Sequence, residues 1–165
     1  MKTRFKLLWL MALGCGIVLC APPAQAQSQF SLTFTNPTPA AYDYFGNSVA
    51  TVGSDRVLIG APFDDTGAGN AGAAYLFSTN GTLLTTFPNP TPAANDYFGN
   101  AVAGVGNDRV LIGAYRADTG ATDAGVAHLF RTNGALLTTF TNPTPAADDY
   151  FGYAVAAVGS DRVLI

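Results

Sequence analysis

Short runs of apolar residues, separated by glycine, asparagine and aspartate, follow one another through the middle of the chain. Residues 45–52 alternate small and apolar side chains, a pattern typical of a strand with one buried face. Residues 56–61, Arg-Val-Leu-Ile-Gly-Ala, form a continuous apolar run after Arg56, as expected for a strand that is buried on both faces. Residues 72–78 and 82–87 complete the set, so the pattern predicts four short strands.

Tight turns separate these predicted strands. Asn80-Gly81 lies between the third and the fourth, and Asn133-Gly134 stands at the equivalent place further along the chain. Asn-Gly between two apolar runs is a strong hairpin signal, because a type I′ turn needs positive φ at both central residues. Residues 53–55, Gly-Ser-Asp, predict a comparably tight turn between the first two strands. We therefore expect antiparallel hairpins.

The four-strand pattern is repeated. The dipeptide Phe-Gly occurs at residues 45, 98 and 151, always 53 residues apart, and 39 of 53 positions are identical between residues 35–87 and 88–140. A period of about 50 residues is typical of propeller blades. Four antiparallel strands per unit, repeated around an axis, make a β-propeller. The fold class is therefore predicted to be all-β, with propeller blades in an incomplete ring.

The period also sets the predicted boundaries. Residues 27–34 fall one period before a fourth strand, so they form an orphan outer strand that is a candidate for closing a ring. Residues 35–87 and 88–140 are two whole blades, and residues 141–165 are a truncated third blade. A propeller has typically four to eight blades, so we interpret the sequence as a fragment of a larger ring.

The first 26 residues have the features of a secretory signal peptide. Lys2, Arg4 and Lys6 precede the apolar stretch 7–20, and residues 24–26, Ala-Gln-Ala, form a small-x-small cleavage site. The stretch is short for a membrane span, which needs about 20 residues. We therefore expect export to the extracellular space or the cell envelope, with no membrane span after cleavage. An uncleaved N-terminal anchor is the alternative.

Composition narrows the function classes. All eleven acidic residues are aspartates, and lysine occurs only at positions 2 and 6, so strong helix formers are few. Without residues 1–26, five arginines remain against eleven aspartates, a net charge of −6. This charge argues against nucleic acid as a partner, because nucleic-acid binding needs a basic patch. Both cysteines, Cys15 and Cys20, lie in the signal segment, which excludes disulfides and cysteine chemistry from the mature chain.

Two ordered motifs resemble the FG-GAP repeat, the blade unit of integrin α-subunit propellers and of many exported bacterial proteins. FGNSVA at 45–50 is similar to the first half of that repeat, and VLIGAP at 57–62 is similar to the second. The second unit keeps both motifs, with Tyr115 in place of the proline. The resemblance covers about residues 30–165. It implies a propeller fold and says little about function, because sites must be argued separately from folds.

The resemblance does not extend to a metal site. Calcium-binding members hold the cation in a loop between the first and second strands, where this chain has only residues 52–56 with one carboxylate, Asp55. Calcium needs six to eight oxygen ligands. We therefore expect no metal and no cofactor.

Ligand-facing residues are sought in the loops 62–71 and 115–124, which differ most between the copies. Variable loops on a rigid scaffold commonly carry binding. The candidates are Asp64, Asp65, Asn70, Asp118 and Asp123. A solvated, glycine-rich loop, or a weak calcium site, is the alternative interpretation of the same residues.

Three aspartates, Asp43, Asp96 and Asp149, precede Tyr-Phe-Gly in every unit. They are expected to cap the turn into the first strand, and the alternative is a ring of carboxylates that attracts cations or basic ligands. A second set, Asp55, Asp108 and Asp161, is expected to form turns and to pair with the arginine that follows each of them. His128 is the only histidine, so we interpret it as a strand residue and not as a catalyst.

The leading hypothesis for function is a secreted, non-enzymatic, adhesion-like module that binds an extracellular or cell-surface protein or glycan. The reasons are the repeated scaffold, the variable loops, the export signal and the lack of a recognisable catalytic motif. The alternative is that these are structural blades of a larger propeller enzyme, whose catalytic residues lie in a C-terminal part beyond this sequence. A third option is a purely structural array on the envelope.

Overall fold

The computed structural model describes residues 32–165, which contain ten β-strands. The strands are β1 (Ser48–Val52), β2 (Arg56–Ala61), β3 (Ala73–Ser78), β4 (Leu83–Pro88), β5 (Val102–Val105), β6 (Arg109–Ala114), β7 (Val126–Arg131), β8 (Leu136–Thr141), β9 (Ala156–Val158) and β10 (Arg162–Leu164). The predicted signal peptide, residues 1–26, and residues 27–31 of the predicted outer strand lie outside the described residues.

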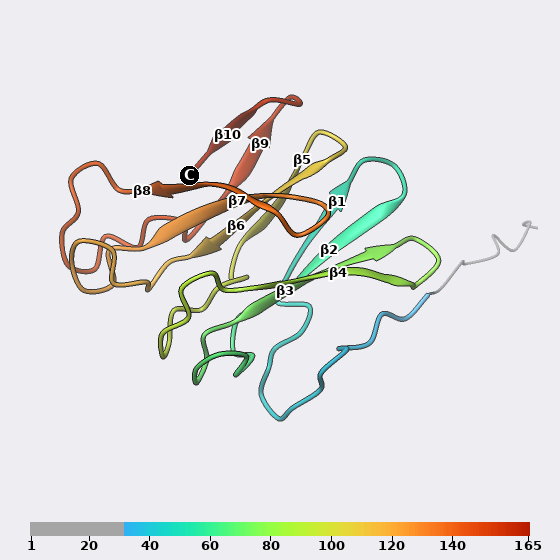
Figure 1. Cartoon of the computed structure of the whole chain (residues 1–165), viewed down its shortest axis with the longest axis horizontal. Coiled ribbons are helices and arrows are strands. Elements are labelled where there is room, and N and C mark those ends of the chain that lie inside the picture. Colours follow the sequence, from blue (N-terminus) through green and yellow to red (C-terminus); the bar gives the residue numbers. More distant parts are fainter. Residues whose placement is uncertain (1–31) are drawn as a thin grey trace, which may run out of the picture. The chain divides into compact units, whose positions relative to one another are not determined.

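The strands form three antiparallel sheets. The first has the order β1-β2-β3-β4, the second has the order β5-β6-β7-β8, and β9 pairs with β10 alone. Figure 1 shows the sheets side by side, with β1, β5 and β9 as neighbours. The strands β4 and β8 are the last strands of their sheets. The all-β propeller plan is thereby confirmed, and residues 32–165 form blades without a closed ring. No helix in this part of the chain is long and apolar enough to cross a membrane.

The predicted strand 45–52 is too long, because the observed β1 begins at Ser48. The Phe-Gly dipeptide lies instead in a turn, in which Asn47 N–H donates to the carbonyl of Tyr44 at 2.9 Å. Gly46 has φ of 93°, a conformation that L-residues with a side chain rarely adopt. The other three strands of the first unit agree with their predicted bounds to within one residue.

The type I′ turn predicted at Asn80-Gly81 is wrong. Only Gly81 has positive φ, at 91°, and its N–H donates to the Ser78 carbonyl at 2.9 Å. Ser78 N–H in turn donates to the carbonyl of Thr82, also at 2.9 Å. This is a three-residue hairpin loop with a type I turn followed by a left-handed glycine. The register shift between Leu76 and Phe77 is a separate β-bulge, since Phe77 pairs with Leu83 and Leu76 pairs with Thr85, which leaves Leu84 unpaired.

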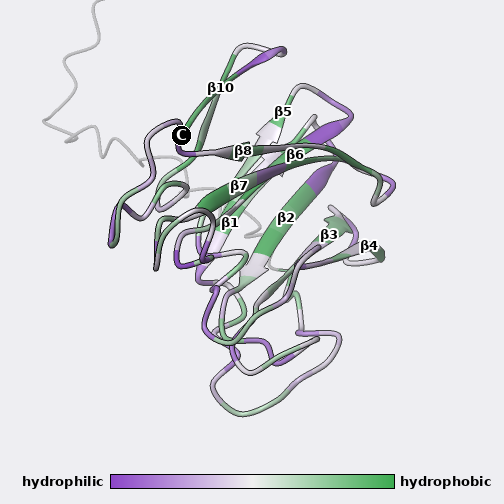
Figure 2. Ribbon diagram, turned by 60° about the vertical axis from the view of Figure 1, so that its left-hand side comes forward, coloured by the Kyte–Doolittle hydropathy of each residue, from purple (hydrophilic) through white to green (hydrophobic). Residues whose placement is uncertain are grey.

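Apolar side chains are buried between the sheets. Leu58, Leu76 and Phe87 of the first sheet pack against residues of the second sheet, Val110, Ile112 and Phe130. The opposite face of the second sheet packs against the β9–β10 sheet. Figure 2 shows the middle of β2 as hydrophobic and its first residues as hydrophilic. Because the second sheet is packed on both faces, its central strands β6 and β7 have no polar face, as the sequence pattern predicted.

Glycines bring the backbones of successive repeats into contact. A Cβ at Gly60 would overlap with the carbonyl oxygen of Gly99, and a Cβ at Gly113 would overlap with that of Gly152. The first glycine of each pair belongs to the second strand of one repeat, and the other belongs to the Phe-Gly turn of the next. The VLIGA motif of one repeat and the Phe-Gly motif of the next are therefore the two sides of the junction between those repeats.

The arginines after the first turn of each repeat are also placed at a junction. The expected pairing with aspartate is confirmed, with Arg56 Nε 3.2 Å from Asp55 Oδ1 and Arg109 Nε 3.5 Å from Asp108 Oδ1. In addition, Arg109 Nη2 donates to the carbonyl of Ser160 at 2.6 Å, and Arg56 Nη2 donates to the carbonyl of Asn107. Each of these arginines thus links its turn to the turn of the next repeat.

Residues 32–34 occupy the place of a fourth strand. The rings of Phe34 and Phe77 are 5.3 Å apart at 63°, and those of Phe87 and Phe130, one period later, are 5.3 Å apart at 60°. Residues 32–34 form no strand themselves. The packing matches the predicted outer strand, whereas the pairing is absent within the described residues.

Candidate functional site

The two ends of the sheets differ in character. One end, called here the loop end, carries the loops 62–72 and 115–125 and the linkers 35–47, 89–101 and 142–154. The other end, called the turn end, carries the short turns 53–55, 79–82, 106–108, 132–135 and 159–161. All five residues that the sequence indicated as ligand-facing lie at the loop end.

The two variable loops close in the same way. Asp65 Oδ1 accepts a hydrogen bond from Asn70 N–H at 2.8 Å, and Asp118 Oδ1 accepts one from Asp123 N–H at 2.8 Å. Asn70 and Asp123 both have positive φ, at 53° and 51°, which asparagine and aspartate tolerate better than most residues. Asp65 and Asp118 are exposed at equivalent places, where both can meet a ligand.

Asp64 is placed differently from its neighbour Asp65. It is only 3% exposed, and its carboxylate accepts hydrogen bonds from the Tyr75 hydroxyl at 2.6 Å and from Thr66 N–H at 2.8 Å. Thr38 Oγ1 donates to the same carboxylate at 3.3 Å. Burial and the hydrogen bond to Asp64 raise the pKa of Tyr75. Asp64 therefore joins the linker, the loop and β3, and it is largely covered from solvent.

The second repeat replaces this pair of residues together. Ala117 stands in place of Asp64, and His128 stands in place of Tyr75. His128 lies in β7 and is 3% exposed, and its Nδ1 is 2.9 Å from the hydroxyl of Thr139. Its Nε2 is buried without a hydrogen-bond partner. Burial lowers the pKa of His128 to about 4. The histidine is neutral at pH 7 and is shielded from any molecule at the surface.

We expect this buried histidine to make the protein less stable in mild acid. In an unfolded chain a histidine titrates near pH 6.5, so below that pH the unfolded state binds a proton that the folded state refuses until about pH 4. The stability is fully present above pH 6.5 and is lost as the pH falls toward 4. Urea unfolding of the wild type and of His128→Tyr should therefore differ in pH dependence across this window, with the variant losing less. Parallel curves would contradict the prediction.

The aspartates that precede Tyr-Phe-Gly fasten the linkers between repeats. Asp96 Oδ2 accepts hydrogen bonds from Asn89 Nδ2 at 2.7 Å and from Ala93 N–H at 2.8 Å, and Asp43 and Asp149 make the equivalent pair of bonds. Burial raises the pKa of Asp96. The expected hydrogen bonding to backbone N–H groups is thus present, although it stabilises the linker before the turn and not the strand after it.

A shallow hollow of about 190 Å³ lies at the loop end of the first repeat. It is lined by Thr38, Ala40, Asp43, Asp64, Asp65 and Thr66. All three of its carboxylates are engaged in the hydrogen bonds described above. Within residues 32–165, no group of three or more histidine, cysteine, aspartate or glutamate side chains is arranged to hold a metal ion.

Aromatic rings form a continuous row along the loop end, which we call the tyrosine ladder. The centroid of Phe63 is 4.8 Å from that of Tyr44 and 4.7 Å from that of Tyr97. Tyr115 continues the row, 5.7 Å from Tyr97 and 5.5 Å from Tyr150. Tyr153 packs on Tyr115 at 5.1 Å. The ladder spans all three repeats, and its ends are open, with Tyr44 57% and Tyr153 62% exposed.

The backbone holds three of these tyrosines in an unusual conformation. Tyr44, Tyr97 and Tyr150 have φ of 53°, 56° and 54°, in the left-handed region that bulky residues rarely adopt. Such strain persists where the surrounding structure fixes it, and it is concentrated at ligand-binding and active sites. The guanidinium of Arg116 lies over three rings of the ladder, 5.5 Å from Tyr97 and 5.8 Å from both Tyr115 and Tyr150.

The tyrosine ladder was not predicted from the sequence. Its one signal there is the tyrosine that precedes Phe-Gly in every unit, directly after the repeated aspartate. Phe63, Tyr115 and Arg116 vary between the repeats, so the repeat itself gave no reason to connect them. Exposed aromatic rings next to fixed carboxylates can stack on a ligand and accept hydrogen bonds from it, which are functions of a binding face.

Comparison with known proteins agrees with this architecture. A model of the FG-GAP repeat matches residues 33–77 and 91–130, which together are more than half of the chain. The matched residues run through the first three strands of the first repeat and of the second repeat. A search of curated proteins found no match. The chain belongs to the FG-GAP repeat family.

Proposed function

We propose that the protein is an exported, non-enzymatic interaction module that binds a protein or glycan at the cell surface or outside the cell. The tyrosine ladder carries the proposal, because a row of partly exposed rings across three repeats is a surface suited to binding. The variable loops stand beside it on a scaffold of packed sheets. Such a scaffold holds the rings in place before a partner arrives, which lowers the cost of binding.

Binding by the ladder can be tested with the full chain immobilised against a panel of purified extracellular proteins and glycans. Tyr44→Ala with Tyr153→Ala should weaken binding to any panel member by about tenfold, because aromatic residues dominate binding energies. Leu84→Ala with Leu137→Ala is the matched control, since these side chains are 48% and 42% exposed on the outer strands β4 and β8. Binding that is lost only in the control would contradict binding by the ladder, and catalytic turnover removed by one substitution would contradict a non-enzymatic role. Absence of binding to every panel member would favour the structural-blade alternative.

Export can be tested separately. When the full chain is expressed in a bacterial host, the exported protein should begin at Gln27, because cleavage is expected after the Ala-Gln-Ala site at 24–26. N-terminal sequencing of the secreted or periplasmic fraction measures this. A product that keeps residues 1–26 and remains with the membrane would support an uncleaved anchor.

A further inference from the structure

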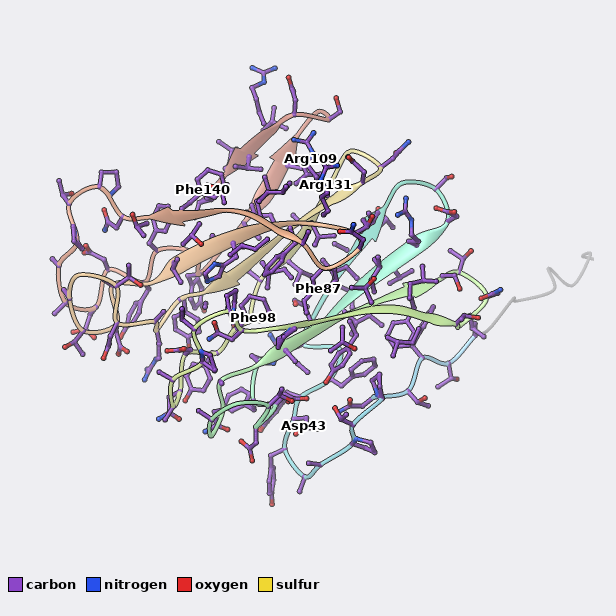
Figure 3. All side chains as sticks on the ribbon, viewed as in Figure 1. Asp43, Phe87, Phe98, Arg109, Arg131 and Phe140 are labelled. Atoms are coloured by element: carbon purple, nitrogen blue, oxygen red, sulfur yellow. The ribbon has the colours of Figure 1, made fainter. Side chains whose placement is uncertain are left out.

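Charge is divided unequally between the two ends of the described residues. The loop end carries eight of the eleven aspartates and only one arginine, so its formal charge is −7. The turn end carries the other three aspartates and four arginines, so its formal charge is +1. Figure 3 shows this separation, with Asp43 at one end and Arg109 and Arg131 at the other. The net charge of the domain is thus concentrated on the face that carries the tyrosine ladder.

The exposed part of this charge has fixed positions. Asp65 and Asp118 each accept one backbone hydrogen bond at 2.8 Å, and Asp148 Oδ1 accepts one from the Tyr150 hydroxyl at 3.0 Å. All three residues are exposed, and each comes from a different repeat. Because the hydrogen bonds already fix these carboxylates, binding a cation costs less side-chain conformational entropy. They are exposed carboxylates at the same end of the sheets as the ladder.

Arg116 shows which chemistry the ladder accepts. Its guanidinium lies within 5.8 Å of three ring centroids, and its Nη1 is 3.8 Å from Asp123 Oδ2. A cation over a tyrosine ring is attracted by the ring quadrupole, and its aliphatic stem covers apolar surface. Arg116 covers only the rings of Tyr97, Tyr115 and Tyr150. The rings of Tyr44 and Tyr153 remain 57% and 62% exposed at the ends of the ladder, and Arg116 is the one arginine among the described residues of the loop end.

From this charge separation and the Arg116 contacts, we propose that the loop end docks a basic polypeptide segment whose lysine and arginine side chains reach the exposed aspartates and tyrosines. The inference rests on the proposed function and names the partner of that face. A face with a charge of −7 steers a basic segment toward it and repels nucleic acid and acidic proteins. A neutral glycan would gain nothing from the carboxylate charge.

The test uses the full chain and a fluorescein-labelled oligolysine of about ten residues, with binding followed by fluorescence anisotropy. The triple variant Asp65→Asn, Asp118→Asn, Asp148→Asn should weaken binding about tenfold at low salt, because it removes three charges while keeping the hydrogen-bond acceptors. The matched control is Asp55→Asn, Asp108→Asn, Asp161→Asn, which makes the same charge change at the turn end and should weaken binding less than about twofold. Circular dichroism checks that all variants fold.

A second variant separates the ladder from net charge. Tyr44→Ala with Tyr153→Ala leaves the charge unchanged and should weaken oligolysine binding about fivefold or more, since two exposed rings that can form cation–π contacts are lost. Equal losses in the two aspartate triples would mean that oligolysine responds only to total charge, and this would overturn the proposal. Absence of oligolysine binding would also overturn it. If oligolysine did not bind but a neutral hexasaccharide bound the ladder, the proposed interaction function would stand without the basic partner. If no panel member bound either, the interaction function and the basic partner would both be contradicted.

Discussion

Phe98→Ala should lower the free energy of unfolding by about 3–5 kcal/mol, the range for removal of a large aromatic side chain from a packed core. Phe98 is fully buried, and its ring lies 5.8 Å from that of His128 and 6.1 Å from that of Phe130. It belongs to the Phe-Gly motif of the second repeat but is buried in the cluster shared with the first sheet. Figure 3 shows Phe98 and Phe87 on the side of the second sheet that faces the first. Urea unfolding followed by circular dichroism measures the loss.

The same motif position in the first repeat supplies the control. Phe45 contacts Tyr75 and Phe77 at 5.9 Å and 6.1 Å, but it is only half-buried because no preceding sheet covers it in the described residues. Phe45→Ala should therefore cost about 1–2 kcal/mol, in proportion to the smaller apolar area that it buries. Equal losses at the two positions would mean that the motif phenylalanine stabilises its own repeat and not the junction between repeats.

The sequence predicted the fold well because the repeat makes the same local signals recur. Residues 56–61 are apolar after Arg56 and match β2 to the residue, since both faces of that strand are largely buried. The turn at Asn80-Gly81 was located correctly but assigned to the wrong type. Residue type alone does not determine whether Asn80 or only Gly81 takes positive φ, because the loop length selects between the two turns.

The candidate site was predicted less completely. Asp64 and Asp65 are adjacent in sequence, yet one is buried and the other exposed, because the loop turns back over the hydroxyl of Tyr75. The replacement of this aspartate and tyrosine together, by Ala117 and His128, was visible in the sequence as a paired change between the repeats. The tyrosine ladder was not visible, since its rings come from linkers and loops that only the packing of the sheets brings together.

Gly60→Ala should destabilise the protein by about 3 kcal/mol or more, because the added methyl group has no room between two backbones. Gly60 lies in β2, and its new Cβ would overlap with the carbonyl oxygen of Gly99 in the next repeat and with Ser48 Oγ. The Gly99 carbonyl lies in the Phe-Gly turn, which is fixed to β6 by the 2.9 Å hydrogen bond from Gly99 N–H to the Gly113 carbonyl, so the two sheets must separate. Thermal and urea unfolding measure the effect, which should be large even though alanine normally favours folding over glycine.

Two controls identify the source of this overlap. Gly69→Ala adds the same methyl group in the loop at 62–72, where no atom lies within 4 Å and φ is not positive, so the change should stay within about 0.5 kcal/mol. Ser48→Ala combined with Gly60→Ala removes only the side-chain part of the overlap. Because the Gly99 carbonyl remains, the double variant should stay strongly destabilised. Full recovery would place the steric conflict inside one sheet, and the two glycine motifs would then no longer be explained as the two sides of a junction between repeats.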